Sequence, residues 1–118
     1  MVHWQQAVNS GEFQLEDFGK KEDQKRYGQD TAPILDLTKI QKMPMGLFSG
    51  SQDELADPTD VAWLRSQIKD DLKLVDVNYE DFGHSTFNIG KYYEVARFLP
   101  DLLEFLDKCF KLDAETSM

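Results

Sequence analysis

An aspartate and a histidine in this sequence are placed to act together in acid–base chemistry, because each follows a predicted strand. Asp53 comes soon after the apolar run 43–48, and His84 follows the alternating pattern 75–79. Neighbouring parallel strands lie about 4.8 Å apart, so the loops that leave their carboxyl ends are within reach of each other. An acid and then a histidine, separated by one crossover helix, match the last two members of a triad in the order Ser, Asp, His.

Such a triad needs all three side chains. A serine hydroxyl is a weak nucleophile until an imidazole accepts its proton, and a carboxylate on the other ring nitrogen fixes the tautomer of that imidazole. None of the serines lies in a Gly-x-Ser-x-Gly elbow, so none is a credible nucleophile. An isolated Gly-His step is a weak signal, and a solvent-exposed loop histidine is the alternative interpretation of His84. The serines are Ser10, Ser49, Ser51, Ser66, Ser85 and Ser117.

Four acidic residues crowd the segment after the first strand, and helix-capping rules help to separate them. Asp57 precedes a proline and is best used as a helix N-cap. Asp60 falls in the first helical turn, where the macrodipole favours an acid. Of the other two, Asp53 and Glu54, the first lies nearer the strand end. We therefore predict that Asp53 is the partner of His84.

The other residues that carry chemistry do not form a site. His3 lies beside Trp4 in a predicted helix and is interpreted as structural. Cys109 is the only cysteine, which excludes an internal disulfide and a cysteine-based zinc site within this sequence. There is no His-x-x-x-His or Cys-x-x-Cys spacing and no glycine-rich phosphate loop. The sequence gives no reason to expect a metal or an organic cofactor.

Composition limits the partners. The 118 residues include 22 Asp and Glu against 13 Lys and Arg, for a formal charge of −9. An acidic surface repels phosphate backbones and anionic lipid headgroups, so nucleic-acid binding and electrostatic membrane anchoring are not expected. No apolar run approaches the roughly 20 residues that span a bilayer, and the first residues have no apolar signal core.

The chain pattern predicts an α/β architecture. The run 43–48 is predicted to be a strand buried on both faces, a helix follows Pro58, and 75–79 is a strand with one more polar face. A broad apolar helical stripe covers 91–110, where Pro100 is expected to begin a new helix, because an interior proline costs about 3 kcal/mol. The order predicts one βαβ crossover with a parallel strand pair.

The flanking segments carry weaker patterns. Residues 2–8 have helical spacing, with a stop at Asn-Ser-Gly, and 19–30 is charged, unpatterned and predicted to be a surface loop. We divide the sequence into an N-terminal region and loop, 1–30, a core, 31–112, and a polar tail, 113–118, that is expected to fray.

A sheet of two parallel strands is incomplete. Parallel sheets need several strands with both faces covered, and two strands leave unpaired N–H and C=O groups at their edges. We expect the rest of the sheet to come from a longer protein or from another chain. A self-completing domain-swapped dimer is a weaker alternative.

Four segments of the sequence form a specific combination. They are His3-Trp4-Gln5-Gln6-Ala7-Val8-Asn9-Ser10-Gly11-Glu12-Phe13-Gln14, Asp17-Phe18-Gly19, Leu55-Ala56-Asp57-Pro58-Thr59-Asp60-Val61 and Phe82-Gly83-His84. Together they resemble the C-terminal third of the acid lipase family, which comprises the gastric and lysosomal lipases and their relatives. The resemblance runs from about Val2 to the last predicted helix.

The resemblance implies an α/β-hydrolase fold with a helical cap, and 1–30 as the end of that cap with its loop. By position, the family's triad acid falls on Asp53 and its histidine on His84. Two departures leave both positions intact: Ser85-Thr86-Phe87 stands where members commonly have Leu-Asp-Phe, and the family's second glycine before the acid is replaced around Ser51. The nucleophile elbow, the oxyanion hole and most of the sheet would lie upstream of this sequence.

The resemblance implies part of a serine esterase that hydrolyses triacylglycerols or cholesteryl esters and needs no cofactor. Asp53 and His84 would serve a serine that another segment or chain supplies, and this chain by itself is predicted to be inactive. The alternative is a non-catalytic, lipase-derived subunit that completes a partner's sheet. The resemblance suggests a secreted or lysosomal protein, although the sequence carries no address of its own.

Overall fold

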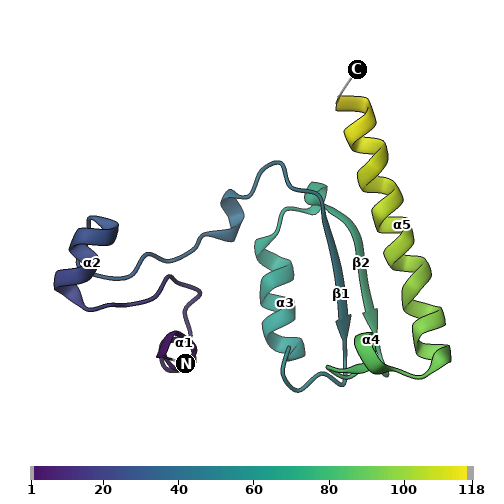
Figure 1. Cartoon of the computed structure of the whole chain (residues 1–118), viewed down its shortest axis with the longest axis horizontal. Coiled ribbons are helices and arrows are strands. Elements are labelled where there is room, and N and C mark those ends of the chain that lie inside the picture. The colour runs from purple at the N-terminus through teal and green to yellow at the C-terminus, as the bar shows by residue number, and fades with distance from the viewer. Residues whose placement is uncertain (1, 117–118) are drawn as a thin grey trace. The chain divides into compact units, whose positions relative to one another are not determined.

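The computed structural model describes the backbone of residues 2–116 and the side chains of residues 3–112. These residues fall into two compact units, Met1–Leu37 and Thr38–Met118 (Figure 1). The elements are α1 Val2–Ser10, α2 Lys20–Tyr27, β1 Met45–Gly50, α3 Pro58–Gln67, β2 Lys73–Tyr79, α4 Thr86–Ile89 and α5 Tyr92–Thr116, with 3-10 turns at Leu37–Lys39 and Asp70–Leu72. Among the described residues, no helix combines the length and the apolar character needed to cross a membrane.

The first unit begins with the short helix that the sequence predicts. α1 ends where Gly11 takes a left-handed conformation, with φ at 67°, and its N–H donates to the Ala7 carbonyl at 2.9 Å. Glycine adopts this φ without steric penalty, so the Asn-Ser-Gly stop is confirmed. Further along this unit, an isolated antiparallel bridge joins Gln14 to Ile34.

The prediction of a surface loop over 19–30 is wrong, because this segment contains the helix α2. Its sequence has no apolar stripe, and its charges stabilise the helix instead. Glu22 pairs with Lys25 at 3.3 Å and with Arg26 at 2.9 Å. The two acids of the helix, Glu22 and Asp23, lie in its first turn, and Lys25 and Arg26 lie in its last turn. Gly28 closes the helix in the left-handed conformation.

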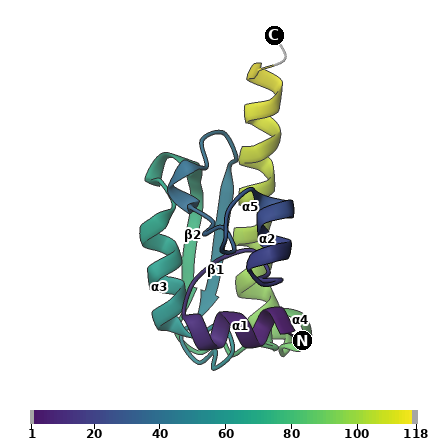
Figure 2. The same ribbon diagram turned by 90° about the vertical axis from the view of Figure 1, so that its left-hand side faces the viewer.

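The second unit contains the predicted βαβ crossover. β1 and β2 pair in parallel, and α3 connects them. The register places Leu47 opposite Asp76 and Gly50 opposite Tyr79, so the last residues of the two strands are partners. Figures 1 and 2 show α3 and α5 on opposite sides of the two strands. The α/β arrangement and the parallel pair are confirmed.

The two faces of this sheet differ in chemistry. On the α5 side, the Phe48 ring meets the Phe98 ring edge-on, with centroids 5.4 Å apart. On the α3 side, Arg65 Nε donates to both carboxylate oxygens of Asp76, at 2.7 and 2.8 Å, and Arg65 Nη2 donates to Ser49 Oγ at 2.9 Å. The prediction that the second strand has one more polar face is confirmed.

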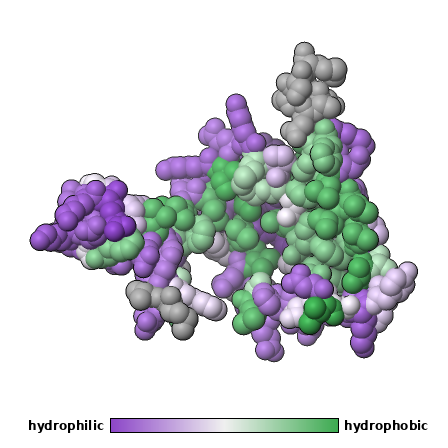
Figure 3. Space-filling view, in the orientation of Figure 1, coloured by the Kyte–Doolittle hydropathy of each residue, from purple (hydrophilic) through white to green (hydrophobic). Residues whose placement is uncertain are grey.

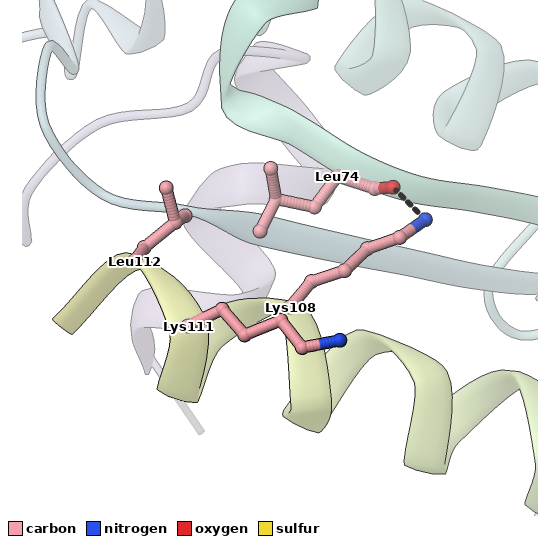
Figure 4. Close-up of a pocket in the computed structure, with 4 residues that line it drawn as sticks. All are labelled: Leu74, Lys108, Lys111 and Leu112. Carbon is pink, nitrogen blue, oxygen red and sulfur yellow. Dashed lines mark hydrogen bonds between the residues drawn. The ribbon is translucent and has the colours of Figure 1, made fainter. Parts of the chain in front are cut away.

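α5 runs through Pro100 without a break, which corrects the prediction of a new helix there. Contacts before and after the proline hold the helix against the sheet. Besides Phe98, the Phe105 ring lies 6.3 Å from that of Phe48, and Lys108 Nζ donates to the Leu74 carbonyl at 3.3 Å (Figure 4). This packing outweighs the roughly 3 kcal/mol cost of an interior proline. The helix continues to Thr116, into the predicted tail, and residues 117 and 118 lie outside the described part of the chain.

An aromatic cluster supports the loop after β2. The Phe82 side chain is 1% exposed and stacks on the Tyr79 ring with centroids 4.4 Å apart. Phe87 meets Phe82 edge-on at 5.1 Å, and Phe98 meets Phe87 at 5.2 Å. The Tyr79 hydroxyl donates to Asp101 Oδ2 at 2.5 Å, and burial together with this carboxylate raises the pKa of Tyr79. The end of β2 is therefore fixed to α5.

The sheet within the described residues has two strands, so each strand has one unpaired edge. Five of the six residues of β1 are only half-buried, which differs from the prediction of a strand buried on both faces. Apolar side chains remain exposed along α5, and Figure 3 shows a broad hydrophobic surface there. Burial on both faces requires neighbouring structure beyond these elements.

We predict that Tyr79→Phe destabilises the second unit. The change removes the hydroxyl that donates to Asp101 but keeps the buried ring, so the free energy of unfolding should fall by about 1–2 kcal/mol. Urea denaturation followed by circular dichroism measures this quantity. Tyr92→Phe is the matched control, since Tyr92 is 89% exposed, and its midpoint should stay unchanged. Equal midpoints for both variants would contradict the assigned role of the hydroxyl.

Candidate active site

The site lies where β1 and β2 end, at the edge of the sheet from which both loops leave (Figure 1). Asp53 follows β1 after a short turn, and His84 follows β2 by way of a turn at 80–83. Because the strands are parallel and Gly50 pairs with Tyr79, the two loops start side by side. The strand register therefore brings residues 31 positions apart into contact.

Backbone hydrogen bonds join the two loops directly. The Ser51 N–H donates to the Tyr79 carbonyl at 2.9 Å, and the Gln52 N–H donates to the Phe82 carbonyl at 3.0 Å. The Gln52 side chain adds a bond from Nε2 to the Glu80 carbonyl at 3.3 Å. These hydrogen bonds hold Ser51 and Gln52, which directly precede Asp53, so the position of the acid depends on both strands.

Gly50 is required by this close approach. A Cβ atom at Gly50 would lie 2.2 Å from the Phe82 carbonyl oxygen, well inside van der Waals contact. The absence of a side chain is what lets the end of β1 pass so near the backbone after β2. At Gly83, by contrast, the nearest atom to such a Cβ is the Gln52 carbonyl oxygen at 3.4 Å, an ordinary contact.

Asp53 is a buried carboxylate whose two oxygens have separate partners. The residue is 5% exposed. Oδ1 accepts from the N–H groups of Leu55 at 2.9 Å and Ala56 at 2.8 Å, and Oδ2 lies 3.2 Å from His84 Nδ1. The backbone donors fix the plane of the carboxylate, which leaves one oxygen directed at the imidazole.

The electrostatics favour an ionised Asp53. Burial raises the pKa of this carboxyl, but the hydrogen bonds from the Ala56 and Leu55 N–H groups and from His84 outweigh burial and hold the pKa below its usual value. A charged acid beside Nδ1 favours the tautomer with its proton on that nitrogen. Nε2 would then be free to accept a proton.

His84 is the exposed member of the pair. Its side chain is 57% exposed, whereas that of Asp53 is 6% exposed. His84 is therefore a solvent-facing loop histidine, as the alternative interpretation held, but it also has a buried carboxylate partner. An accessible imidazole held by a buried acid can exchange a proton with a third group that approaches from outside.

The neighbouring acids have other roles. Asp57 Oδ1 accepts from the Thr59 N–H at 2.7 Å, which lowers the pKa of Asp57 and confirms it as the N-cap of α3. Asp60 lies in the first turn of the same helix, as predicted. Of Asp53, Glu54, Asp57 and Asp60, only Asp53 is hydrogen-bonded to His84 within the described part of the chain. The structure thus brings together the two residues that the sequence singled out, and their catalytic role stays a prediction.

The remaining candidates, His3 and Cys109, have other surroundings. His3 Nε2 is 3.0 Å from the Gln14 carbonyl within the first unit, in agreement with its structural interpretation. Cys109 is a free, half-buried cysteine in α5. Among residues 3–112, no group of three or more His, Cys, Asp and Glu side chains is placed to hold a metal ion.

Sequence reasoning missed two residues that shape the site, Gln52 and Thr86. Gln52 joins the two loops, and the Thr86 hydroxyl accepts from the Gly83 N–H beside His84 at 3.1 Å. The available signal for Thr86 was its spacing, because a threonine three residues after a glycine can close a turn through its side chain. Gln52 left no such signal, because its partner is a carbonyl on the other strand's loop.

Comparison with known proteins finds lipases. The chain is 39% identical over 88 residues to lipase lipl-1 of Caenorhabditis elegans and 40% identical over 94 residues to human lipase member K. It is 34% identical over 112 residues to the tear acid lipase-like protein of Mesocricetus auratus. These matches cover 70%, 77% and 92% of this chain but only 22%, 22% and 26% of the relatives' length. No protein-family model matches the chain.

We predict that Gly50→Ala separates the two loops and destabilises the second unit by about 2–3 kcal/mol, because the added methyl group collides with the Phe82 carbonyl. Gly83→Ala is the matched control and should change stability by less than about 1 kcal/mol. Chemical denaturation of both variants gives the comparison. A Gly50→Ala protein as stable as Gly83→Ala would show that the approach is looser than described.

We also predict that Asp53 contributes to the stability of the fold in a pH-dependent way. Its pKa is lower in the folded state, so its carboxylate stabilises the fold above the unfolded-state pKa of about 3.9, and this contribution disappears as pH falls through the folded-state value. Asp53→Asn keeps the shape and should therefore lose most stability near neutral pH and least in acid. Denaturation of the wild-type and Asp53→Asn proteins between neutral and acid pH measures the difference in their free energies of unfolding. A difference that does not change with pH would contradict the prediction.

Proposed function

Because this chain belongs to the acid lipase family, we propose that it supplies the aspartate and histidine of a Ser-Asp-His triad in an esterase that acts on lipid esters. The observation that carries the proposal is the 3.2 Å approach of His84 Nδ1 to Asp53 Oδ2. The chain spans about a quarter of its relatives' length, and the proposal is that the complete activity needs further polypeptide.

The pair can perform both proton transfers of ester hydrolysis. Nε2 of His84 would take the proton from an attacking serine and later return it to the leaving alcohol, while Asp53 holds the ring and stabilises the imidazolium. The donors on Asp53 Oδ1 support this role, because they keep the acid ionised without using the oxygen that faces the imidazole.

The nucleophile must come from another segment or chain. Ser49 donates to Asn78 at 3.0 Å, and Ser51 accepts from Asn78 at 2.7 Å, so both hydroxyls belong to a network with other polar side chains. No serine in the sequence has the elbow pattern. We therefore propose that this chain is inactive by itself and becomes part of an active site when the remainder of the hydrolase fold joins it.

The open surfaces of the second unit support such a partner. Each of its two strands has an unpaired edge, which further strands of a hydrolase sheet would complete. The apolar face of α5 is also uncovered (Figure 3), since Leu103 is 55% exposed and Phe110 is 72% exposed. Large exposed side chains in a continuous stripe are typical of a surface that packs on other structure.

We predict that His84→Ala lowers kcat for triacylglycerol hydrolysis by about 10⁶-fold in the complete enzyme, because the serine loses its base. His3→Ala is the matched control, since His3 has its own partner, the Gln14 carbonyl, within the first unit, and the kcat of this variant should match that of the unmodified enzyme. The assay follows fatty acid release from an emulsion.

Two results would contradict the proposal. One is an unchanged kcat in the folded His84→Ala enzyme. The other is hydrolysis by this chain with no second polypeptide present. An assembled complex that is inactive with every ester tested would favour a purely structural, lipase-derived subunit instead.

A further inference from the structure

The turn that carries His84 is closed by two bonds between the same two residues. The Thr86 N–H donates to the Gly83 carbonyl at 3.1 Å, and the Gly83 N–H donates to Thr86 Oγ1 at 3.1 Å. His84 and Ser85 are the two central residues of this turn. Their backbone is therefore held by one main-chain bond and one side-chain bond.

The local backbone geometry agrees with a tight turn. Ser85 has φ −84° and ψ −6°, close to the third position of a type I turn. Its side chain makes no capping bond to α4, although it occupies the N-cap position. The side chain that ties this helix start to the preceding chain is that of Thr86.

Both ends of the turn are fixed, but His84 is not otherwise held. Before the turn, the buried Phe82 accepts a bond from the Gln52 N–H. After it, the Phe87 ring packs edge-on against Phe82 at 5.1 Å. The His84 side chain is 57% exposed and contacts Asp53 through Nδ1. The direction of the imidazole thus depends on the shape of the turn between these two anchors.

We infer that Thr86 is a positioning residue for His84, and that its hydroxyl keeps Nδ1 of the imidazole on the Asp53 carboxylate. This inference rests on the proposed function. Without the hydroxyl, the Gly83 N–H loses its acceptor and the turn relaxes towards solvent. The imidazole then leaves Asp53 Oδ2, and the neutral ring is no longer held with its proton on Nδ1.

The test uses the ¹⁵N-labelled full chain with wild-type Thr86, Thr86→Val and Thr86→Ser. Valine keeps the shape without the acceptor oxygen, and serine keeps the oxygen. The ¹⁵N shifts of the neutral imidazole report which nitrogen carries the proton. His3 is an internal reference of opposite geometry, because its Nε2 faces the Gln14 carbonyl.

We expect neutral His84 to carry its proton mainly on Nδ1 in the wild-type and serine proteins, and the Nδ1–H fraction to fall about twofold or more in the valine variant. The His3 signals should not change. A folded valine variant with the wild-type tautomer would overturn the inference and leave the Asp53–His84 pair intact. A wild-type chain with His84 protonated on Nε2 would instead refute the pair, and with it both the inference and the proposed function.

A measurement on the unmodified chain covers the case in which the valine variant does not fold. The Gly83 amide should exchange with solvent more slowly than a free loop amide, because it donates to Thr86. Exchange at the rate of an unprotected amide would overturn the inference.

Discussion

The close approach of the backbone after β1 to the backbone after β2 is the constraint on which the site depends. Parallel pairing brings Gly50 opposite Tyr79, and the space at Gly50 is already filled by the Phe82 carbonyl oxygen. A side chain at this point would collide with that oxygen. From there, the Gln52 N–H bonds to Phe82, and Asp53 reaches the next loop. A strand register shifted by one residue would place a side chain where none fits.

The same loops solve an electrostatic problem. A buried carboxylate is costly unless hydrogen bonds compensate for the water that it loses. Asp53 receives that compensation from two backbone N–H groups and one imidazole, none of which needs a charged partner. Its ionised form is therefore maintained in a site that leaves the imidazole open to solvent. In the proposed mechanism, the buried acid orients the base and the exposed base exchanges protons.

Helix prediction failed in two places for related physical reasons. α2 lacks an apolar stripe, so hydrophobic periodicity does not predict it. The spacing of its ion pairs and the Gly28 that ends it can nevertheless be recognised in the sequence. α5 contains a proline that favours a break when considered alone. The contacts of Phe98 and Phe105 with Phe48 lie on either side of it in the chain and outweigh its cost. In both helices, interactions between side chains stabilise a helix that apolar periodicity and proline rules do not predict.

The sequence by itself determined the parallel strand pair, the helix between the strands, the N-cap at Asp57 and the choice of Asp53 and His84 as partners. These features follow from local spacing, capping chemistry and strand direction, which are properties of short segments. Only the tertiary structure decided that Gly50 must be glycine and that Gln52 joins the loops. Those facts depend on which backbone atoms lie within about 3 Å of each other once the strands pair. Every residue has a backbone carbonyl, so the sequence does not indicate which carbonyl is approached.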